Sequence, residues 1–312
     1  MIHHRMENLL LPIPILKSMH KIKGILWVAF GAISYGVLAT FVKVANNNGA
    51  HTGVLTFVQF LVGAAFLSVF VLMQNKKTIP SQKPDAKSRI KLIIGGTSLG
   101  LTSTFYYLSI QYIPVSMGII LLMQTIWMGI LLEFFIAPKN VTKLKLLAGL
   151  ITIIGTLLAT NIFAESFDLN ITGLIYGLLA ALSYTATLYV SNHVANHLLP
   201  MTRSMYLVLG GLLATVLYWN VEIITFFDFE TLWKWGIFLA IFGTIIPPIA
   251  FTKGLPVIGT GLGSILSALE IPVSILSAHF VLGEVVSPIQ WVGILIILGS
   301  IVLINTKTRM LE

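Results

Sequence analysis

Apolar residues run along this chain in long, uninterrupted segments, and polar residues collect in short stretches between them. A helix needs about 20 apolar residues to cross the hydrocarbon core of a membrane. The pattern predicts ten such helices, at residues 24–45, 52–73, 91–111, 115–137, 145–163, 171–191, 203–221, 233–252, 257–282 and 288–305. An outer-membrane barrel would instead show alternating segments of about 10 residues. The fold class is therefore predicted to be an all-α polytopic membrane protein.

Turn-forming residues separate several of the predicted helices, and prolines occur inside others. The shortest connections are expected at residues 46–51, 113–114 and 254–256. Prolines interrupt predicted helices of the second half at Pro247, Pro248 and Pro272. A proline leaves a backbone carbonyl without its helical partner, so such interruptions in membrane helices often line cavities.

The first 22 residues are predicted to be a cytosolic extension. Their apolar stretch, Leu9–Leu16, is too short to span a membrane and contains two prolines. It also lacks the small-residue cleavage site that would follow a signal peptide. Met19 is an alternative start, which leaves open whether residues 1–18 belong to the native protein.

The composition excludes most other classes of protein. Of the 312 residues, 56% are hydrophobic and only 10% are charged, whereas a soluble domain carries about 25% charged residues. A soluble enzyme and a disordered chain are thus excluded. The absence of cysteine excludes a secreted disulfide scaffold.

The net charge of +8 is explained by topology. If both termini are cytosolic, 17 of the 19 basic residues fall on the cytosolic side, and only Lys43 and Lys234 lie at outer ends. Cytosolic loops of membrane proteins carry such an excess of Lys and Arg. We therefore predict the cytoplasmic (inner) membrane as the location, both termini in the cytosol, and no nucleic-acid partner.

The two halves of the chain resemble each other. Gly24–Gly36 matches Gly173–Thr185 at an offset of 149, which places Tyr35 and Tyr184 alike in the two halves. Each half has five predicted helices, and an odd number inverts the second copy, as in many secondary transporters. We therefore divide the chain into a cytosolic extension, a first repeat, a second repeat and a cytosolic tail, at 1–22, 23–163, 164–306 and 307–312.

A family resemblance rests on two stretches of sequence. Leu269–Asn305 contains an acidic residue near a proline, then Leu-Gly-Glu, then Gln-x-x-Gly and a glycine-spaced last helix. Ser34–Gly36, Phe41 and Lys43 form the second stretch. Residues 21–306 thereby resemble EamA-type carriers of the drug/metabolite transporter superfamily. The resemblance implies ten helices, cytosolic termini and transport of small metabolites, most commonly amino acids.

Glu270 is the strongest candidate for a functional residue, because it lies near the middle of a predicted span. A carboxylate there is costly, at about 2.5 kcal/mol or more on insertion scales. It is expected to face the interior, where it would bind a substrate amine or carry a coupling proton. The alternative is a structural carboxylate that is hydrogen-bonded to nearby hydroxyls.

Four further residues are candidates for substrate binding or coupling. Gln124 matches Glu270 at an offset of 146 and suits an uncharged polar ligand group, or a hydrogen bond between helices. Lys43 is expected either to extend to the membrane interface or to face a substrate carboxylate. Tyr35 and Tyr184 are predicted to line the cavity, with core packing as the alternative.

Three residues are candidates for gating or helix breaking: Pro272, His279 and Glu133. Glu133 and His279 share the 146 offset, but inversion places them at opposite ends of the bundle, so they are not expected to touch. His193 and His197 have a spacing that can hold a metal, yet the chain has no cysteine and no acidic residue between them. No metal and no cofactor are predicted.

These features together predict a secondary active transporter rather than an enzyme. It would move a small metabolite, an amino acid or a related compound, in the direction of export by alternating access. The alternatives are a membrane-embedded enzyme and a channel or facilitator for a small polar solute. The expected partners are the substrate, the lipid bilayer and, as a coupling ion, protons; monomer and homodimer both stay open.

Overall fold

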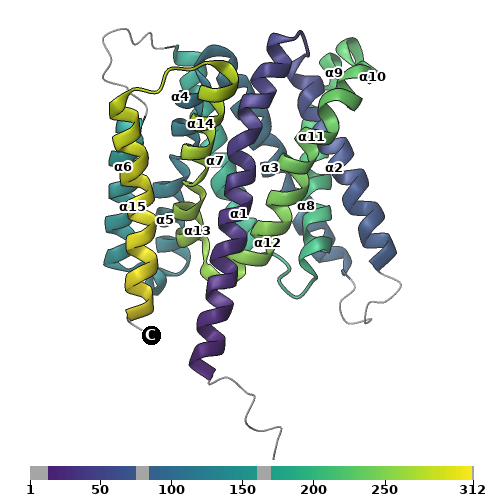
Figure 1. The fold of residues 1–312 in the computed structure, drawn as a ribbon. Coiled ribbons are helices and arrows are strands. Elements are labelled where there is room, and N and C mark those ends of the chain that lie inside the picture. Colours follow the sequence, from purple (N-terminus) through teal and green to yellow (C-terminus); the bar gives the residue numbers. More distant parts are fainter. Residues whose placement is uncertain (1–12, 75–83, 160–169, 311–312) are drawn as a thin grey trace, which may run out of the picture.

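The computed structural model describes residues 13–74, 84–159 and 170–310, and over these ranges the chain is helical, without strands (Figure 1). The predicted helical class is therefore confirmed. Seven of the described helices are long and apolar enough to cross a membrane: Met19–Asn47, Thr52–Met73, Val115–Ile136, Ile171–His193, Pro200–Tyr218, Phe229–Ile258 and Thr260–Leu282. The remaining predicted spans also fall on helices, and the count of ten stays a prediction.

The first half of the chain forms six α-helices and a short 3₁₀ turn, Pro138–Asn140. The helices are α1 (Ile13–Asn47), α2 (Thr52–Gln74), α3 (Ala86–Tyr112), α4 (Val115–Leu122), α5 (Thr125–Ile136) and α6 (Lys143–Ala159).

The second half has the same general plan with more interruptions. Its helices are α7 (Ile171–His193), α8 (Pro200–Tyr218), α9 (Asn220–Phe226), α10 (Phe229–Thr231), α11 (Ile237–Leu239), α12 (Ile246–Ile258), α13 (Thr260–Ser267), α14 (Glu270–Leu282) and α15 (Pro288–Met310). Two π-helical segments, Leu232–Gly236 and Ala240–Ile245, join α10, α11 and α12 into one continuous helical run.

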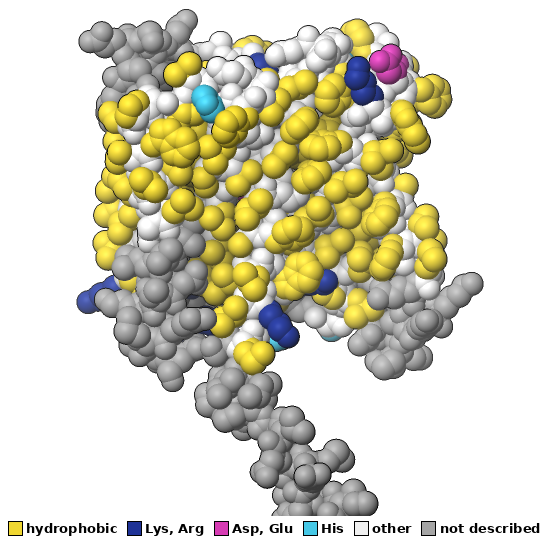
Figure 2. Space-filling view, viewed as in Figure 1, with side chains coloured by type: hydrophobic (Ala, Val, Ile, Leu, Met, Phe, Trp, Pro, Cys, Tyr) yellow, Lys and Arg dark blue, Asp and Glu magenta, His cyan; other side chains and the backbone are white. Residues whose placement is uncertain are grey.

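The helices form one bundle with two ends. Helix α1 begins and helix α15 finishes at the same end (Figure 1), which we call the terminal end; the opposite end is the distal end. On the face shown in Figure 2, apolar side chains cover the bundle between its two ends, and most of the visible Lys and Arg side chains lie near the terminal end. Exposed apolar areas of this size mark a surface that contacts lipid. That the terminal end is cytosolic stays a prediction.

Helices of the two halves pack on one another. Helix α1 contacts α12 and α14, α3 lies against α7 and α8, and α6 packs on α15. Helices α3 and α8 approach closely at Gly96 and Gly100, because a Cβ at either position would overlap backbone atoms of Leu207 or Gly211 in α8. Small residues allow such close approach in membranes, where packing drives association.

The expected connection at 254–256 is wrong. Helix α12 continues through Pro256 to Ile258, and the chain turns at Gly259, whose φ of 83° favours glycine. Pro256 has no N–H to donate to the carbonyl of Thr252, and Nη1 of Arg203 donates to that carbonyl instead, at 2.8 Å. The helix can therefore pass the proline without leaving a carbonyl unpaired.

The predicted spans 115–137 and 257–282 are not continuous helices. Each breaks near its middle, between α4 and α5 at Met123–Gln124 and between α13 and α14 at Ala268–Leu269. At the second break the N–H of Ile271 donates to the carbonyl of Ala268, because Pro272 has no N–H for it. The two half-helix ends thus lie in the interior of the bundle.

Candidate functional site

Glu270 is the first residue of α14 and lies at the break between α13 and α14. Its side chain is 1% exposed, and its Oε1 accepts a hydrogen bond from the hydroxyl of Tyr184 in α7, which is equally buried. A carboxyl group inside a membrane protein needs such a partner, because an unpaired polar group is costly there. The break in the helix thereby presents a hydrogen-bonded carboxyl group to the interior.

Aromatic rings surround this pair. The ring of Tyr35 lies edge-on to the ring of Tyr184, with centroids 6.0 Å apart, and both rings contact Phe251 of α12. The two tyrosines and Glu270 line one small cavity of about 20 Å³, large enough for a single water molecule. Tyr35, Tyr184 and Glu270, all predicted as site residues, are therefore brought together by the fold.

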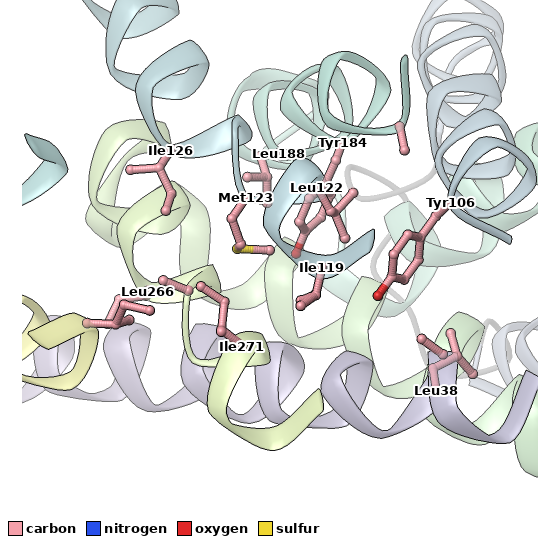
Figure 3. Close-up of a cluster of buried hydrophobic side chains, with 14 of the residues drawn as sticks. Leu38, Tyr106, Ile119, Leu122, Met123, Ile126, Tyr184, Leu188, Leu266 and Ile271 are labelled. Atoms are coloured by element: carbon pink, nitrogen blue, oxygen red, sulfur yellow. The ribbon is translucent and has the colours of Figure 1, made fainter. Parts of the chain in front are cut away.

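Two tyrosines of α3 complete the lining of the cavity. Tyr107 donates a hydrogen bond of 2.6 Å to Oε1 of Gln59 in α2. The hydroxyls of Tyr106 and Ser274 are buried beside each other without a well-formed hydrogen bond. Figure 3 shows Tyr106 and Tyr184 approaching the same apolar core from α3 and α7. Neither of these α3 tyrosines is among the residues predicted for the site; the signal for them in the sequence is the neighbouring polar pair Thr102–Ser103 in the middle of an apolar span.

The structure does not bring Gln124 to this cavity. Its Nε2 donates to the carbonyl of Ile120, and its Oε1 accepts from Nε1 of Trp127, 2.8 Å away. The Trp127 ring is exposed and lines an apolar groove between α5 and α6. The break before α5 turns Gln124 toward the outside of the bundle, which its sequence offset from Glu270 did not indicate.

Lys43 also lies outside the central cavity. It sits near the distal end of α1, and its Nζ donates to the carbonyl of Ile110 at 2.6 Å. Together with Glu284 it lines a separate, open cavity at that end.

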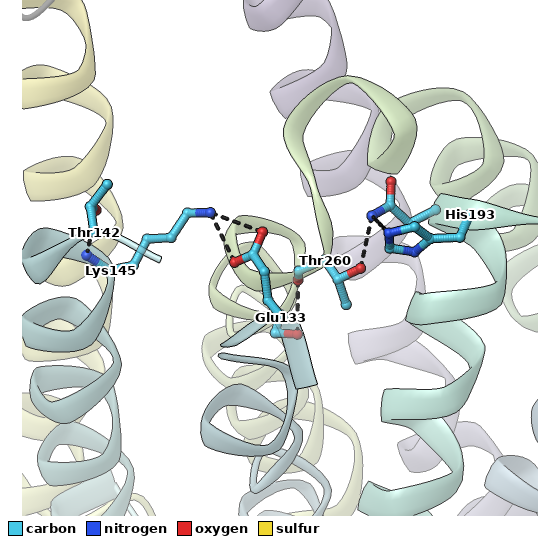
Figure 4. Close-up of polar contacts among 7 residues, drawn as sticks. Glu133, Thr142, Lys145, His193 and Thr260 are labelled. Carbon is cyan, nitrogen blue, oxygen red and sulfur yellow. Dashed lines mark hydrogen bonds and ion pairs between the residues drawn. The ribbon is translucent and has the colours of Figure 1, made fainter. Parts of the chain in front are cut away.

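Glu133 lies near the terminal end, at the contact between α5 and α13 (Figure 4). Its two carboxylate oxygens accept from Nζ of Lys145 at 3.1 and 2.9 Å. The same carboxylate lies against Gly261, where a Cβ would overlap it. The start of a helix favours a negative charge, so the Glu133 carboxylate of the first half is stabilised against the first turn of α13 in the second half, while its ion pair with Lys145 joins α5 to α6.

Beside this ion pair, the side-chain amide of Asn192 in α7 is hydrogen-bonded to the hydroxyl of Thr260, at 2.9 Å. Helices α5 and α13 also pack closely here, because Gly129 of α5 lies directly against Ser264 of α13. The terminal end of the cavity is thus closed by a tight contact among α5, α7 and α13.

His279 lies at the other end of the molecule, as predicted. It is exposed at the end of α14, and its Nδ1 lies 2.7 Å from the carbonyl oxygen of Glu284. Pro272 lies in the first turn of α14, two residues after Glu270. Among the described contacts, none joins His279 to Glu133.

Arg203 is one of the 17 basic residues predicted on the cytosolic side, but it is not a solvated loop residue. It lies in the first turn of α8 and is 1% exposed. Its guanidinium donates to the carbonyls of Ser191, Val194 and Thr252, at 2.6, 3.0 and 2.8 Å. The first two carbonyls belong to the end of α7, where helical carbonyls have no partner of their own. Arg203 therefore joins α7, α8 and α12.

Comparison with known proteins adds the family. A model of the EamA-like transporter family matches residues 22–161 and again residues 171–306. The chain belongs to the EamA-like transporter family. The double match corresponds to the two halves seen in the sequence.

Relatives and a solved structure agree with this membership. An Archaeoglobus fulgidus protein named "Uncharacterized transporter" is 24% identical, over 88% of this chain and 94% of that protein. The Salmonella typhimurium protein named "Uncharacterized inner membrane transporter YicL" is 27% identical, over 92% and 96%. A crystal structure that shares 15% identity superposes with a TM-score of 0.71, over 95% of this chain and 99% of the other, which shows a common fold.

This EamA-like chain is therefore a multi-pass membrane transporter. Its central cavity combines a buried carboxyl group, several tyrosine hydroxyls and aromatic rings, in contact with helices of both EamA-like units. Such a set can bind a small molecule that has a hydrogen-bonding or cationic group and an apolar or aromatic part.

Proposed function

We propose that the protein is a secondary active transporter that exports a small metabolite, an amino acid or a related compound, across the cytoplasmic membrane. The observation that supports this most is the buried Glu270–Tyr184 pair at the break between α13 and α14. Broken helices at mid-membrane are the usual place for substrate and ion sites in transporters. Both termini would lie in the cytosol, as the distribution of basic residues indicates.

Alternating access would move the two EamA-like units against each other. Their order along the chain supports two five-helix repeats of inverted topology, and α1 of the first unit packs on α12 and α14 of the second. The terminal end is closed by Glu133 and its neighbours, whereas the distal end has an open cavity. This arrangement corresponds to a state that is closed toward the terminal end.

Glu270 is proposed to bind the amine of the substrate or to carry a proton that is exchanged for it. Either role needs a carboxyl group that can gain and lose a partner, and Tyr184 is the partner present here. Because the cavity has room for only one water molecule in this state, the surrounding helices must separate before a metabolite can enter.

The test is solute flux into proteoliposomes by the wild type and by Glu270→Gln, with and without a pH gradient. We expect the substitution to abolish flux or to make it independent of the gradient, while the protein is still made and folds. Tyr184→Phe keeps the ring and removes the donor, and it should show a weaker form of the same defect. Wild-type flux with wild-type pH dependence in Glu270→Gln would contradict the proposed role.

The same preparation separates the alternative functions. A carrier shows saturable counterflow, whereas a channel gives currents that are proportional to voltage. A membrane-embedded enzyme would convert its substrate without net movement of that substrate across the bilayer. Currents or turnover in place of counterflow would therefore replace the proposal with one of these functions.

A further inference from the structure

Two opposite charges share the open cavity at the distal end without pairing. The cavity has a volume of about 560 Å³, and its lining includes Lys43, Ile113, Pro114, Glu284 and Val285. Among the described residues, neither Lys43 nor Glu284 forms an ion pair within 4.0 Å. Two opposite charges that line one cavity without forming an ion pair leave space for a ligand that can contact both.

Lys43 has donors available in this cavity. One N–H of its ammonium group goes to the carbonyl of Ile110, which has lost its helical donor because the residue four positions later is Pro114. An ammonium group has three donors, so two are left for other acceptors. The hydrogen bond to Ile110 fixes the direction of the side chain without satisfying it.

Hydrogen bonds to its backbone N–H and carbonyl groups fix the position of Glu284. Helix α14 ends at Leu282 and is capped by Gly283, which has the left-handed φ of 72° that favours glycine at this position. The N–H of Glu284 donates to the carbonyl of Ala278, and its own carbonyl oxygen lies 2.7 Å from Nδ1 of His279. His279 thus acts as a positioning residue for the acidic side of the cavity.

The same two helices carry this cavity and the central one. Lys43 follows Tyr35 by eight residues on α1, which is about 12 Å along the helix. Glu284 follows directly after α14, the helix that Glu270 begins, and α1 packs against α14. A ligand bound at the distal cavity therefore lies on the elements that must move to expose Glu270.

We propose that Lys43 and Glu284 form a distal binding site for the zwitterionic head of an α-amino acid. Lys43 takes the carboxylate, Glu284 takes the ammonium group, and the apolar wall at Ile113, Pro114 and Val285 takes an uncharged side chain. The proposal rests on the proposed transport function, and it adds a second site to that of Glu270.

The experiment measures the thermal stability of the full-length protein in detergent with each of the common amino acids. For the amino acid that stabilises most, its amide and its deaminated acid are then compared, because each keeps only one of the two charges. We expect the zwitterion to bind more tightly than either analogue by about tenfold or more, the value of one hydrogen bond to a charged group.

Variants assign the two charges. Lys43→Gln should remove the advantage of the amino acid over its amide, and Glu284→Gln should remove its advantage over the deaminated acid. Lys43→Arg should restore binding, which excludes a general folding defect. Lys234→Gln and Glu230→Gln are matched controls, because this exposed pair lies outside the cavity.

Three results would overturn the proposal: no stabilisation of the wild type by any amino acid, binding of one analogue as tight as that of the zwitterion, or cavity variants that behave like the controls. The transport function is tested separately by flux. Flux that depends on Glu270 but not on Lys43 or Glu284 refutes the distal site alone, whereas counterflow missing for every solute refutes the proposed function itself.

Discussion

At each end of the bundle, a proline leaves one backbone carbonyl without its helical N–H donor, and a basic side chain donates to that carbonyl instead. At the terminal end, Pro256 deprives the Thr252 carbonyl of a helical donor and Arg203 replaces it; at the distal end, Pro114 deprives the Ile110 carbonyl and Lys43 replaces it. Arg203 is fully buried and joins three helices. Lys43 is half-buried beside an open cavity.

The difference shows which end is built to stay closed in this state. The guanidinium of Arg203 makes three hydrogen bonds to carbonyls. At the same end, the Glu133–Lys145 ion pair joins α5 to α6, and its carboxylate lies against the first turn of α13. At the distal end the opposite charges of Lys43 and Glu284 stay apart. A basic side chain that replaces the donor missing at a proline is therefore structural where it is enclosed, as at Arg203. Where water reaches it, as at Lys43, it is available to a ligand.

The largest effect is expected for Arg203→Met. Removal of the guanidinium leaves three carbonyls without donors in a region that excludes water, and unsatisfied buried groups cost about 1–3 kcal/mol each. We therefore expect a loss of about 3 kcal/mol or more in the free energy of unfolding, measured by denaturant titration in detergent micelles. Arg89→Gln, an exposed position at the start of α3, is the control and should change stability by less than about 0.5 kcal/mol.

A double-mutant cycle with Pro256→Ala tests the reason for that loss. Alanine restores an N–H four residues after Thr252, so Arg203→Met should cost about 1 kcal/mol less in the Pro256→Ala background. Equal losses in both backgrounds would show that Arg203 does not replace the missing donor.

An intermediate effect is expected for Glu133→Gln. The substitution removes the ion pair with Lys145 at a contact where the Glu133 side chain is only 6% exposed. If the state closed at the terminal end loses about 1.4 kcal/mol of stabilisation, the population of molecules open at that end rises tenfold. The chain has no cysteine, so a single Ser267→Cys reports opening by its rate of maleimide labelling from the terminal side. Unchanged labelling would contradict a closing role, and Lys139→Gln is the matched control.

The smallest effect on stability is expected for Lys43→Met. Water can reach the distal cavity and donate to the Ile110 carbonyl in place of the lysine, so the loss should be about 1 kcal/mol or less. The same denaturant titration measures it beside Arg203→Met. A loss as large as that of Arg203→Met would remove the contrast between the two ends.

Part of the candidate site could be predicted from sequence. Glu270 is a carboxylate in an apolar run, and Tyr35 and Tyr184 occupy equal places in the two halves; each signal is local or repeats at a constant offset. Gln124 shows the limit of that reasoning. The offset placed it opposite Glu270, but the break at Met123–Gln124 rotates the following residues, so its side chain reaches Trp127 instead.

The burial of Arg203 and Tyr106 also could not be predicted from the sequence. A basic residue next to a predicted loop is normally solvated, and only the approach of α7 and α12 encloses Arg203. Tyr106 resembles any aromatic residue in a membrane helix until α3 is placed beside Glu270 and Ser274. The burial of both residues depends on how each helix is rotated about its axis. The sequence does not specify that rotation, because a membrane helix has apolar residues on every side.

Four features follow from the amino-acid sequence without any structure: the chain is a helical membrane protein, most of its helices can be located, its two halves are related, and Glu270 is the charged residue deepest in a predicted span. Apolar length and single costly charges are properties of local segments, so they can be read one segment at a time. The tertiary structure alone decided where α4–α5 and α13–α14 break and that Glu270 meets Tyr184. It alone also placed Arg203 and Lys43 on the carbonyls that two prolines leave unpaired, because those outcomes depend on the packing of helices far apart in the chain.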